Sequence, residues 1–275
     1  MSQVGSDEED LTRKQRREQA RAERKAAEEA AATDAARRKR LTQLGGAVAV
    51  VVVAIVVILI ATSGGATSKV APTSPKAKSE VAAVTSLLAG TTQSGNVLGS
   101  PKAPVTLQYF GDLECPICRD FTLGALPTII QKWVKTGKLR IEYRSLETAT
   151  REPETFRTQQ VAALAAGKQN KAWDFIELFY HEQGEEGSGY VTEGYLQGLA
   201  QQVPGLSLAK WTAARGDHTL LAQIEADTQE ANSHNFTGTP SFLVGKTGGQ
   251  PKKYEYVSLT DASGFEVAFE QALKS

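Results

Sequence analysis

Hydrophobic and polar residues divide the chain into a charged arm, an apolar segment and a longer mixed region. Residues 1–44 mix charged residues with alanine and contain no aromatic residue, which is typical of a solvated arm without a core. Residues 45–62 are almost entirely apolar and carry no charge. As a helix this segment would be about 27 Å long, close to the roughly 30 Å hydrocarbon thickness of a bilayer. The pattern therefore predicts one transmembrane helix at 45–62, embedded in the lipid bilayer.

Two alternatives compete with an uncleaved anchor. A buried soluble helix would need charged or polar residues on one face, and the apolar segment lacks such a face. A cleaved signal peptide has a short basic leader and an apolar run of about 7–15 residues. Here the leader is long and the run is longer, although the small residues at 61–66 would permit cleavage. The prediction is an uncleaved signal anchor.

Flanking charges predict the orientation of this anchor. The basic cluster 37–40 directly precedes the apolar segment, whereas Lys69, Lys76 and Lys78 follow it more sparsely. The more basic side of a single-pass helix stays in the cytoplasm. We therefore expect a single-pass protein of the cell membrane, with the arm 1–44 in the cytoplasm and the rest of the chain outside, in a compartment that permits disulfides.

The remaining chain reads as a linker followed by an α/β domain. Residues 63–95 are predicted to be a linker with a possible short helix at 81–88, and residues 96–275 the folded domain. The hydrophobic pattern predicts a strand-helix-strand unit, a helical insertion, two strands and a last helix. The expected ranges are 105–110, a helix to about 135 with a kink at Pro127, 139–145, an insertion at about 150–235, 241–244, 253–257 and 262–273.

Composition agrees with this division and narrows the function. Every aromatic residue lies after residue 100, and Trp133, Trp173 and Trp211 are expected in the core of the folded domain. The chain has 31 basic and 31 acidic side chains, so its overall charge gives no reason to expect nucleic-acid binding.

The chain contains 2 cysteines, Cys115 and Cys118, which leaves none for a scaffold of structural disulfides. They form a Cys-Pro-Ile-Cys motif at a predicted strand-to-helix junction. The free N–H groups and the dipole at a helix N-terminus stabilise a thiolate, which is the reactive form of cysteine. We expect Cys115 to be the exposed nucleophile and Cys118 the shielded resolving thiol one turn further on. Pro116 suits the first helical turn, where no N–H is required.

Two inert interpretations of the cysteine pair remain open. A zinc site needs about four ligands, and the three histidines, His181, His218 and His234, are not spaced as a pair. A structural disulfide across so short a loop would constrain little of the unfolded chain. We expect neither a metal nor another cofactor.

A second motif is Gly238-Thr239-Pro240, directly before a predicted strand. Proline is excluded from the interior of a central strand, so Pro240 should occupy the first strand position. A cis peptide at Thr239–Pro240 would make a tight turn there, although propensity alone does not predict it, since most X–Pro bonds are trans.

Taken together, these motifs resemble the DsbA-like branch of the thioredoxin superfamily in its membrane-anchored bacterial form. The resemblance covers about residue 88 to the C-terminus and is carried by residues 97–106, 110–112, 115–118, 169–173 and 238–240. It implies a thioredoxin-like fold with a helical insertion. It also implies that Cys115 and Cys118 form a redox-active disulfide beside the cis-proline Pro240, and that the backbone of Thr239 pairs with a substrate chain. Pro116 and Ile117, between the cysteines, are expected to contact the substrate.

Two positions depart from the pattern of this branch. Related domains often carry a buried glutamate where this chain has Tyr109. Asp112 and Glu114 are nearby carboxylates and could substitute for this glutamate, but a turn residue and a solvated side chain are the roles expected of them. Ile117 replaces a histidine that would favour the thiolate of Cys115, so the disulfide is expected to be less oxidising than in relatives with histidine.

The function expected from the resemblance is a dithiol oxidase that introduces disulfides into reduced, unfolded secreted or membrane proteins. A quinone-coupled membrane oxidase is the implied partner for its reoxidation. A reductase or isomerase would use the same residues, because the redox potential sets the direction. A non-catalytic binding module or metallochaperone on the same fold is a further alternative, and it predicts that Cys115→Ser leaves the function intact.

Overall fold

A six-stranded sheet forms the centre of residues 74–274, the part of the chain that the computed structural model describes. Its strand order is β1-β2-β4-β3-β5-β6. The central strand β3 pairs in parallel with β4 and antiparallel with β5. The strands are β1 (Gln93–Ser94), β2 (Val97–Leu98), β3 (Val105–Gly111), β4 (Leu139–Ser145), β5 (Ser241–Lys246) and β6 (Lys252–Tyr254).

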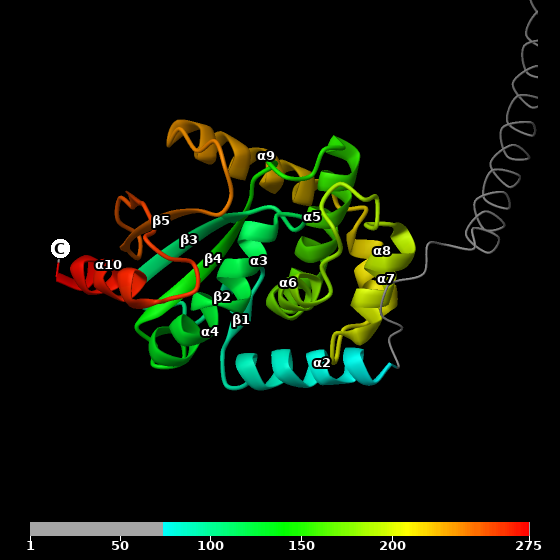
Figure 1. Ribbon diagram of the computed structural model, residues 1–275, viewed down its shortest axis with the longest axis horizontal. Helices are drawn as coiled ribbons and strands as arrows, with labels where there is room; N and C mark the ends of the chain where they lie inside the picture. The colour runs from blue at the N-terminus through cyan, green and yellow to red at the C-terminus, as the bar shows by residue number, and fades with distance from the viewer. Residues whose placement is uncertain (1–73, 275) are drawn as a thin grey trace, which may run out of the picture. The chain divides into compact units, whose positions relative to one another are not determined.

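Helices cover the sheet and form a separate group beside it (Figure 1). An α/β thioredoxin-like fold with a helical insertion is thereby confirmed, with the insertion running from α5 to α9 between β4 and β5. The helices are α2 (Pro75–Leu88), α3 (Pro116–Leu123), α4 (Ala125–Ile129), the π-helical turn η1 (Ile130–Val134), α5 (Pro153–Gly167), α6 (Ala172–His181), α7 (Glu193–Gln202), α8 (Leu208–Ala214), α9 (His218–Ser233) and α10 (Ser263–Lys274).

Both faces of the central strand β3 are buried, as expected for a strand with few polar residues. Tyr109 of β3 packs with Phe121 of α3 and Phe242 of β5 in the main core, which the insertion and α10 complete. On the opposite face, the neighbouring Phe110 packs with Phe236, which follows α9. Successive side chains of β3 therefore pack into layers on opposite sides of the sheet. This packing fixes the end of the strand that leads to α3.

The strand predictions at 105–110 and 139–145 are confirmed by β3 and β4, and the last helix by α10. The strand predicted at 241–244 continues to Lys246, whereas the one predicted at 253–257 is limited to Lys252–Tyr254. The short strands β1 and β2 were not predicted, because a strand of two residues is too short to show an alternation of apolar and polar positions.

The active-site helix is broken at Gly124, three residues before the kink predicted at Pro127. A side chain at Gly124 would come within 2.8 Å of the carbonyl oxygen of Leu259, so only glycine permits this approach of the two backbones. The N–H of Ala125 donates to the same carbonyl at 2.9 Å. The prediction at Pro127 is wrong because this proline falls in the first turn of α4, where its missing N–H costs nothing.

Helix α2 begins at Pro75, six positions before the helix expected at 81–88. The side chain of Ser74 accepts a hydrogen bond from the N–H of Ala77 at 3.1 Å, and the proline occupies the first turn. Val84 and Leu88 are buried in the main core. The folded part of the chain thus includes residues that the sequence assigned to the linker.

Within residues 74–274, no helix combines the length and the apolar character needed to cross a membrane. The arm predicted at 1–44 and the transmembrane helix predicted at 45–62 lie outside the described residues.

Candidate active site

The candidate site lies at the carboxyl end of β3, where the chain turns into α3. Cys115 is the N-cap of this helix and Pro116 is its first residue. The backbone N–H of Cys115 donates to the carbonyl of Asp112 at 3.0 Å, which closes the turn before the helix. The predicted strand-to-helix junction therefore exists, and it places Cys115 where the free N–H groups of a helix start are available.

Both cysteines are free thiols in this structure. The N–H of Cys118 points at the sulfur of Cys115 over 3.4 Å, and the Cys115 thiol donates to the carbonyl of Thr239 at 3.3 Å. Cys115 keeps 5% of its surface exposed, whereas Cys118 has 0%. Cys115, which was expected to be exposed, is thus nearly as buried as Cys118, and only a small part of its surface distinguishes it as the outer thiol.

Hydrogen bonding separates the acidities of the two thiols. The pKa of Cys115 is lowered to about 7, mainly because the side chain of Cys118 hydrogen-bonds to its sulfur, with smaller contributions from Thr239 and the helix N–H groups. Burial opposes this shift. The pKa of Cys118 is raised well above the ordinary value, first because the thiol is buried and then because of its neighbour Cys115. Of the two thiols, Cys115 is therefore the one that ionises near neutral pH.

The carbonyl of Thr239 lies against Cys115, and the peptide bond between Thr239 and Pro240 is cis, as the resemblance implied. Pro240 is buried and Thr239 half-buried. Pro116 is exposed beside the nucleophile, and Ile117 has 44% of its surface exposed. The exposed Pro116 and Ile117 thus form an apolar edge beside Cys115, whose thiol also contacts the Thr239 carbonyl.

Tyr109, which stands where related domains often carry glutamate, is fully buried. Its hydroxyl donates to the hydroxyl of Tyr180 at 3.1 Å, and that of Tyr180 donates to the carbonyl of Asp112 at 3.1 Å. Burial raises the pKa of Tyr109 well above the ordinary value, and the charge of Cys118 adds to this. The position beneath the inner sulfur is therefore filled by neutral hydroxyl groups.

Asp112 does more than shape a turn. Its carboxylate is fully buried and accepts hydrogen bonds from the N–H groups of Thr148, Ala149 and Thr150 at 3.0, 2.9 and 2.9 Å. It also accepts from the N–H of Glu114 at 3.1 Å, which is the expected turn contact. Asp112 thus joins the start of α3 to the loop after β4.

Glu114 is not the solvated side chain that its sequence context suggested. Only 3% of its surface is exposed, and burial raises its pKa. The N–H of Glu114 donates to the carboxylate of Asp112. Thr150 and Gly187 act on the Glu114 carboxylate and partly offset the rise in its pKa. The burial of Glu114 follows from the helical insertion, which the residue's local sequence does not reveal.

The insertion also contributes a residue that the sequence did not single out. The side-chain amide of Gln183, after α6, donates to the carbonyls of Leu113 and Cys115 at 2.7 and 3.1 Å. These carbonyls belong to the catalytic turn, residues 112–115, which joins β3 to α3. No sequence signal marks Gln183, because its partners lie about 70 positions away.

The arrangement is suited to thiol–disulfide exchange. It offers one thiol, Cys115, with a small exposed area and a pKa lowered to about 7, a second thiol one helical turn further on, and the backbone carbonyl of Thr239 beside Cys115. Among the residues that the structure describes, no group of three or more His, Cys, Asp or Glu side chains is arranged to hold a metal ion.

Comparisons with known proteins point to the same chemistry. The thioredoxin family model matches residues 91–259. The disulfide bond formation protein D of Bacillus subtilis is 27% identical over 153 residues, which cover 54% of this chain and 66%, just under two thirds, of that protein.

Solved structures support the fold. Oxidised BdbD of Bacillus subtilis superposes with a TM-score of 0.56 at 24% identity, covering 67% of this chain and 98% of that one. The alpha-DsbA1 protein of Wolbachia pipientis gives a TM-score of 0.53 at 19% identity, covering 65% and 90%. The chain therefore belongs to the thioredoxin family, as a DsbA-like member that carries the CxxC dithiol of a thiol:disulfide oxidoreductase.

Proposed function

We propose that this protein is an extracytoplasmic dithiol oxidase that transfers its disulfide to reduced secreted or membrane proteins. The observation that carries the proposal is the unequal pair of thiols, with an ionisable outer Cys115 over a fully buried Cys118, next to the Thr239 carbonyl. The oxidative direction is supported by the relative from Bacillus subtilis, whose name describes disulfide bond formation.

The geometry supports a specific order of steps. A substrate thiolate attacks the sulfur of Cys115 in the oxidised protein, the Cys115–Cys118 bond breaks, and Cys118 takes up a proton. The second thiolate of the substrate then attacks the substrate sulfur of the mixed disulfide. Cys115 leaves as a thiolate, and its lowered pKa makes it a good leaving group. The Thr239 backbone would pair with the substrate chain during both steps.

The pKa of Cys115 bears on the oxidising strength. A thiolate that is more stable in the reduced protein makes the disulfide a stronger oxidant. With a Cys115 pKa of about 7, and Ile117 instead of a histidine, we expect an intermediate potential, between about −270 and −120 mV.

The cellular setting is part of the proposal. Residues 45–62 would anchor the chain in the cell membrane, with the arm 1–44 in the cytoplasm and the catalytic domain outside. The reduced enzyme would be reoxidised by a quinone-coupled membrane oxidase, as the DsbA-like pattern implies. The basic cluster 37–40 supports the orientation.

The test is oxidation of a reduced, unfolded disulfide protein such as ribonuclease A by the oxidised full chain in detergent. We expect stoichiometric disulfide formation with the oxidised parent chain and none with Cys115→Ser. In the reverse direction, the Cys115 thiolate of Cys118→Ser should attack a disulfide of oxidised ribonuclease A, release one substrate thiolate and remain in a trapped mixed disulfide. Equilibration with glutathione measures the potential. A chain that leaves ribonuclease reduced but reduces insulin disulfides when supplied with electrons would instead be a reductase.

A further inference from the structure

The end of α6 and the residues directly after it hold the backbone of the catalytic turn. The hydroxyl of Tyr180 donates to the carbonyl of Asp112 at 3.1 Å. The side-chain amide of Gln183 donates to the carbonyls of Leu113 and Cys115 at 2.7 and 3.1 Å. Three backbone carbonyls of the turn are thus bound by the helical insertion, and the contact with the nucleophile's own carbonyl comes from Gln183.

The peptide unit between Leu113 and Glu114 is fixed from both sides. Its carbonyl accepts from Gln183, and its N–H donates to the carboxylate of Asp112 at 3.1 Å. Because a peptide unit is planar, contacts on its two opposite edges prevent it from rotating. Leu113 is also fully buried, so the loss of the amide would leave a buried acceptor without this donor.

Cys115 is held in the same way on both sides of its α-carbon. Its N–H donates to the carbonyl of Asp112 at 3.0 Å. Its carbonyl accepts from Gln183 and, at 3.2 Å, from the N–H of Arg119 in the first turn of α3. These contacts fix the backbone angles of Cys115. The direction in which its side chain leaves the backbone therefore depends on the amide of Gln183.

This direction decides which groups the sulfur of Cys115 meets. The N–H of Cys118 points at the sulfur over 3.4 Å, and the thiol donates to the carbonyl of Thr239 at 3.3 Å. A helix N–H stabilises a thiolate only while it points at the sulfur. A rotation of the catalytic turn would lengthen this contact, and Cys115 would then be harder to ionise.

We propose that Gln183 is a positioning residue for thiol–disulfide exchange: by holding the carbonyls of Leu113 and Cys115, it keeps the Cys115 sulfur in front of the N–H groups of α3. This inference deepens the proposed function and rests on Cys115 as the nucleophile. The action of Gln183 passes through the backbone of the turn, because its amide binds carbonyl oxygens there.

The experiment is the rate of iodoacetamide labelling of Cys115 against pH, in the reduced full chain in detergent. Gln183→Met keeps the length of the side chain and removes its donor. We expect the midpoint to rise by roughly 0.3–0.7 pH unit, a two- to five-fold loss of thiolate below the midpoint. The substitution changes no charge, and the titratable groups around the thiol stay in place: Asp112 and Glu114 before it, Cys118 on α3 and Tyr256 after β6.

Gln169→Met is the matched control. Gln169 is half-buried, like Gln183, and its amide exchanges two hydrogen bonds with the backbone of Ser207, at 3.1 and 2.9 Å. Its partner belongs to the insertion rather than to the catalytic turn. The control therefore loses a comparable set of hydrogen bonds, and its labelling midpoint should match that of the parent chain.

An unchanged or lower midpoint for Gln183→Met overturns the proposal, as does an equal rise in Gln169→Met, which would indicate a general loss of stability. Should Gln183→Met fail to fold, Gln183→Ala opens the two carbonyls to water and should give the same rise. If the parent chain oxidises ribonuclease A but the midpoint of the variant does not move, the positioning role alone fails. If Cys115 of the parent chain does not ionise near neutral pH, the proposed function fails with it.

Discussion

Burial distinguishes the two sulfurs of the dithiol by their access to reagents as well as by their acidity. Cys115 keeps a small exposed area and a pKa of about 7, whereas Cys118 is fully buried with a raised pKa. In the reduced native chain we expect iodoacetamide to add one label, at Cys115, with a midpoint near pH 7. Mass spectrometry of the labelled chain checks this. Labelling of Cys118 before Cys115, or a midpoint near pH 9, would contradict the assignment of roles.

A second prediction at the residue scale concerns Glu177 of α6. Its side chain is fully buried, neither carboxylate oxygen has a hydrogen-bond partner, and burial raises its pKa to about 8. The folded state therefore holds a proton that the unfolded chain releases above about pH 4.5. The stability of the domain should fall as pH rises from about 4.5 to 8, and Glu177→Gln should remove this part of the loss.

Denaturant unfolding at pH 5 and pH 8 measures the effect of Glu177→Gln. We expect the variant to be more stable than the parent chain at pH 8, by about 1–3 kcal/mol, and close to it at pH 5. Glu270→Gln on the exposed side of α10 is the matched control and should change neither value. Equal effects of Glu177→Gln at both pH values would exclude a titrating carboxyl.

At the same scale, the sequence predicted the reactive residues better than the residues that hold them in place. Cys115, Cys118, Thr239 and Pro240 could be named because each belongs to a short motif with a local physical reason. Asp112 was expected mainly to shape a turn. The N–H groups that its carboxylate binds come from a loop 36–38 positions away. Such pairings depend on the tertiary fold and leave no local pattern.

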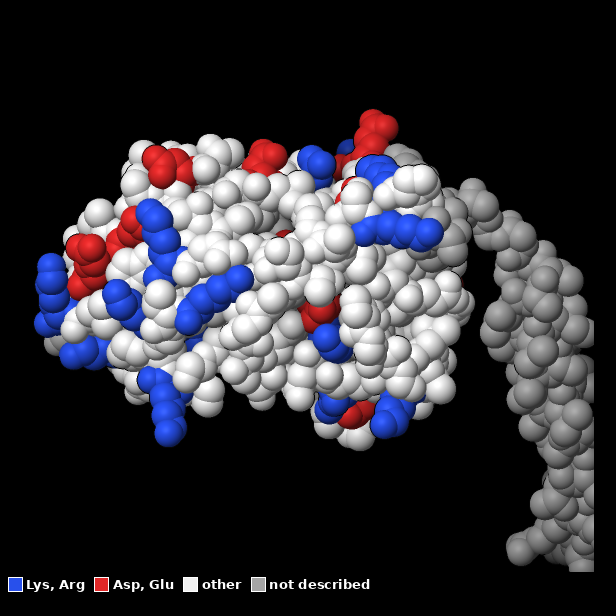
Figure 2. Space-filling model, turned by 90° about the horizontal axis from the view of Figure 1, so that it is seen from below, with Lys and Arg blue, Asp and Glu red and all other residues white. Residues whose placement is uncertain are grey.

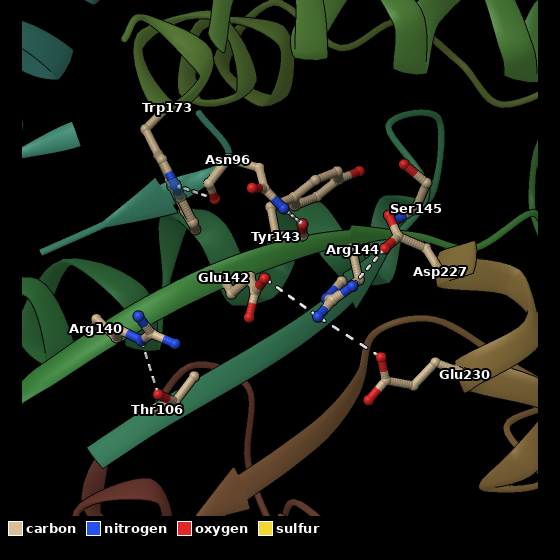
Figure 3. A network of polar contacts seen from close by, with 10 residues as sticks. All are labelled: Asn96, Thr106, Arg140, Glu142, Tyr143, Arg144, Ser145, Trp173, Asp227 and Glu230. Carbon is tan, nitrogen blue, oxygen red and sulfur yellow. Dashed lines mark hydrogen bonds and ion pairs between the residues drawn. The ribbon is translucent and has the colours of Figure 1, made fainter. Parts of the chain in front are cut away.

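Among the elements, α9 is held to the sheet by the polar network in Figure 3. Arg144 of β4 contacts Asp227 at 2.8 Å and Glu230 at 3.6 Å on α9, and Glu142 at 3.2 Å on its own strand. Asp227 is fully buried and also accepts from the N–H of Ser145 at 2.9 Å. Because α9 leads into the segment before Thr239, this clamp fixes the path of the chain to the active site.

Asp227→Ala should destabilise the domain by about 2–4 kcal/mol, because it leaves a half-buried guanidinium and a buried N–H without their partner. Glu230→Ala removes a more exposed partner of the same arginine and should cost less than about 1 kcal/mol. Urea unfolding of the two variants measures the difference. Equal losses would show that the burial of Asp227 has no special weight.

Helix α2 gives another prediction at this scale. Leu88 is 6% exposed and packs in the main core, although the sequence placed it in a linker. Leu88→Ala should therefore lower the stability by about 2–4 kcal/mol. The exposed Lys78 on the same helix offers a control, since Lys78→Ala should have little effect. If thermal unfolding gave equal midpoints for both variants, α2 would not belong to the cooperative unit.

The sequence predicted the existence of the long elements more accurately than their boundaries. Strong apolar alternation marked β3 and β4, whereas the early start of α2 depends on the cap at Ser74. The break at Gly124 follows from a contact with Leu259, which lies more than 130 positions away. A local signal such as Pro127 could not compete with this contact.

On the scale of the whole molecule, the β-α-β order and the two motifs were sufficient to predict the fold. Basic and acidic side chains are interspersed on the face shown in Figure 2, with Lys and Arg gathered toward the side of α10. The parts that remained unpredicted, such as the contacts of Gln183, join the insertion to the catalytic turn. They depend on how distant elements pack, which local periodicity does not encode.

The membrane anchor remains a prediction at this scale. We expect the full chain to stay with the membrane pellet in alkaline carbonate, because residues 45–62 are long enough to span the bilayer. Deletion of 45–62 should release the protein into the soluble fraction. Extraction of the full chain by carbonate would contradict an integral anchor and favour cleavage after the apolar segment.

The amide of Gln183, which holds two carbonyls of the catalytic turn, has a consequence for engineering. An enzyme designer who trims this scaffold to its smallest redox core would treat the insertion as a detachable module. Removing the insertion would leave the carbonyls of Leu113 and Cys115 without the amide that donates to them. It would also remove the Tyr180 hydroxyl, which donates to the carbonyl of Asp112. A minimised version must therefore rebuild that donor from another part of the scaffold, or accept a loosened turn.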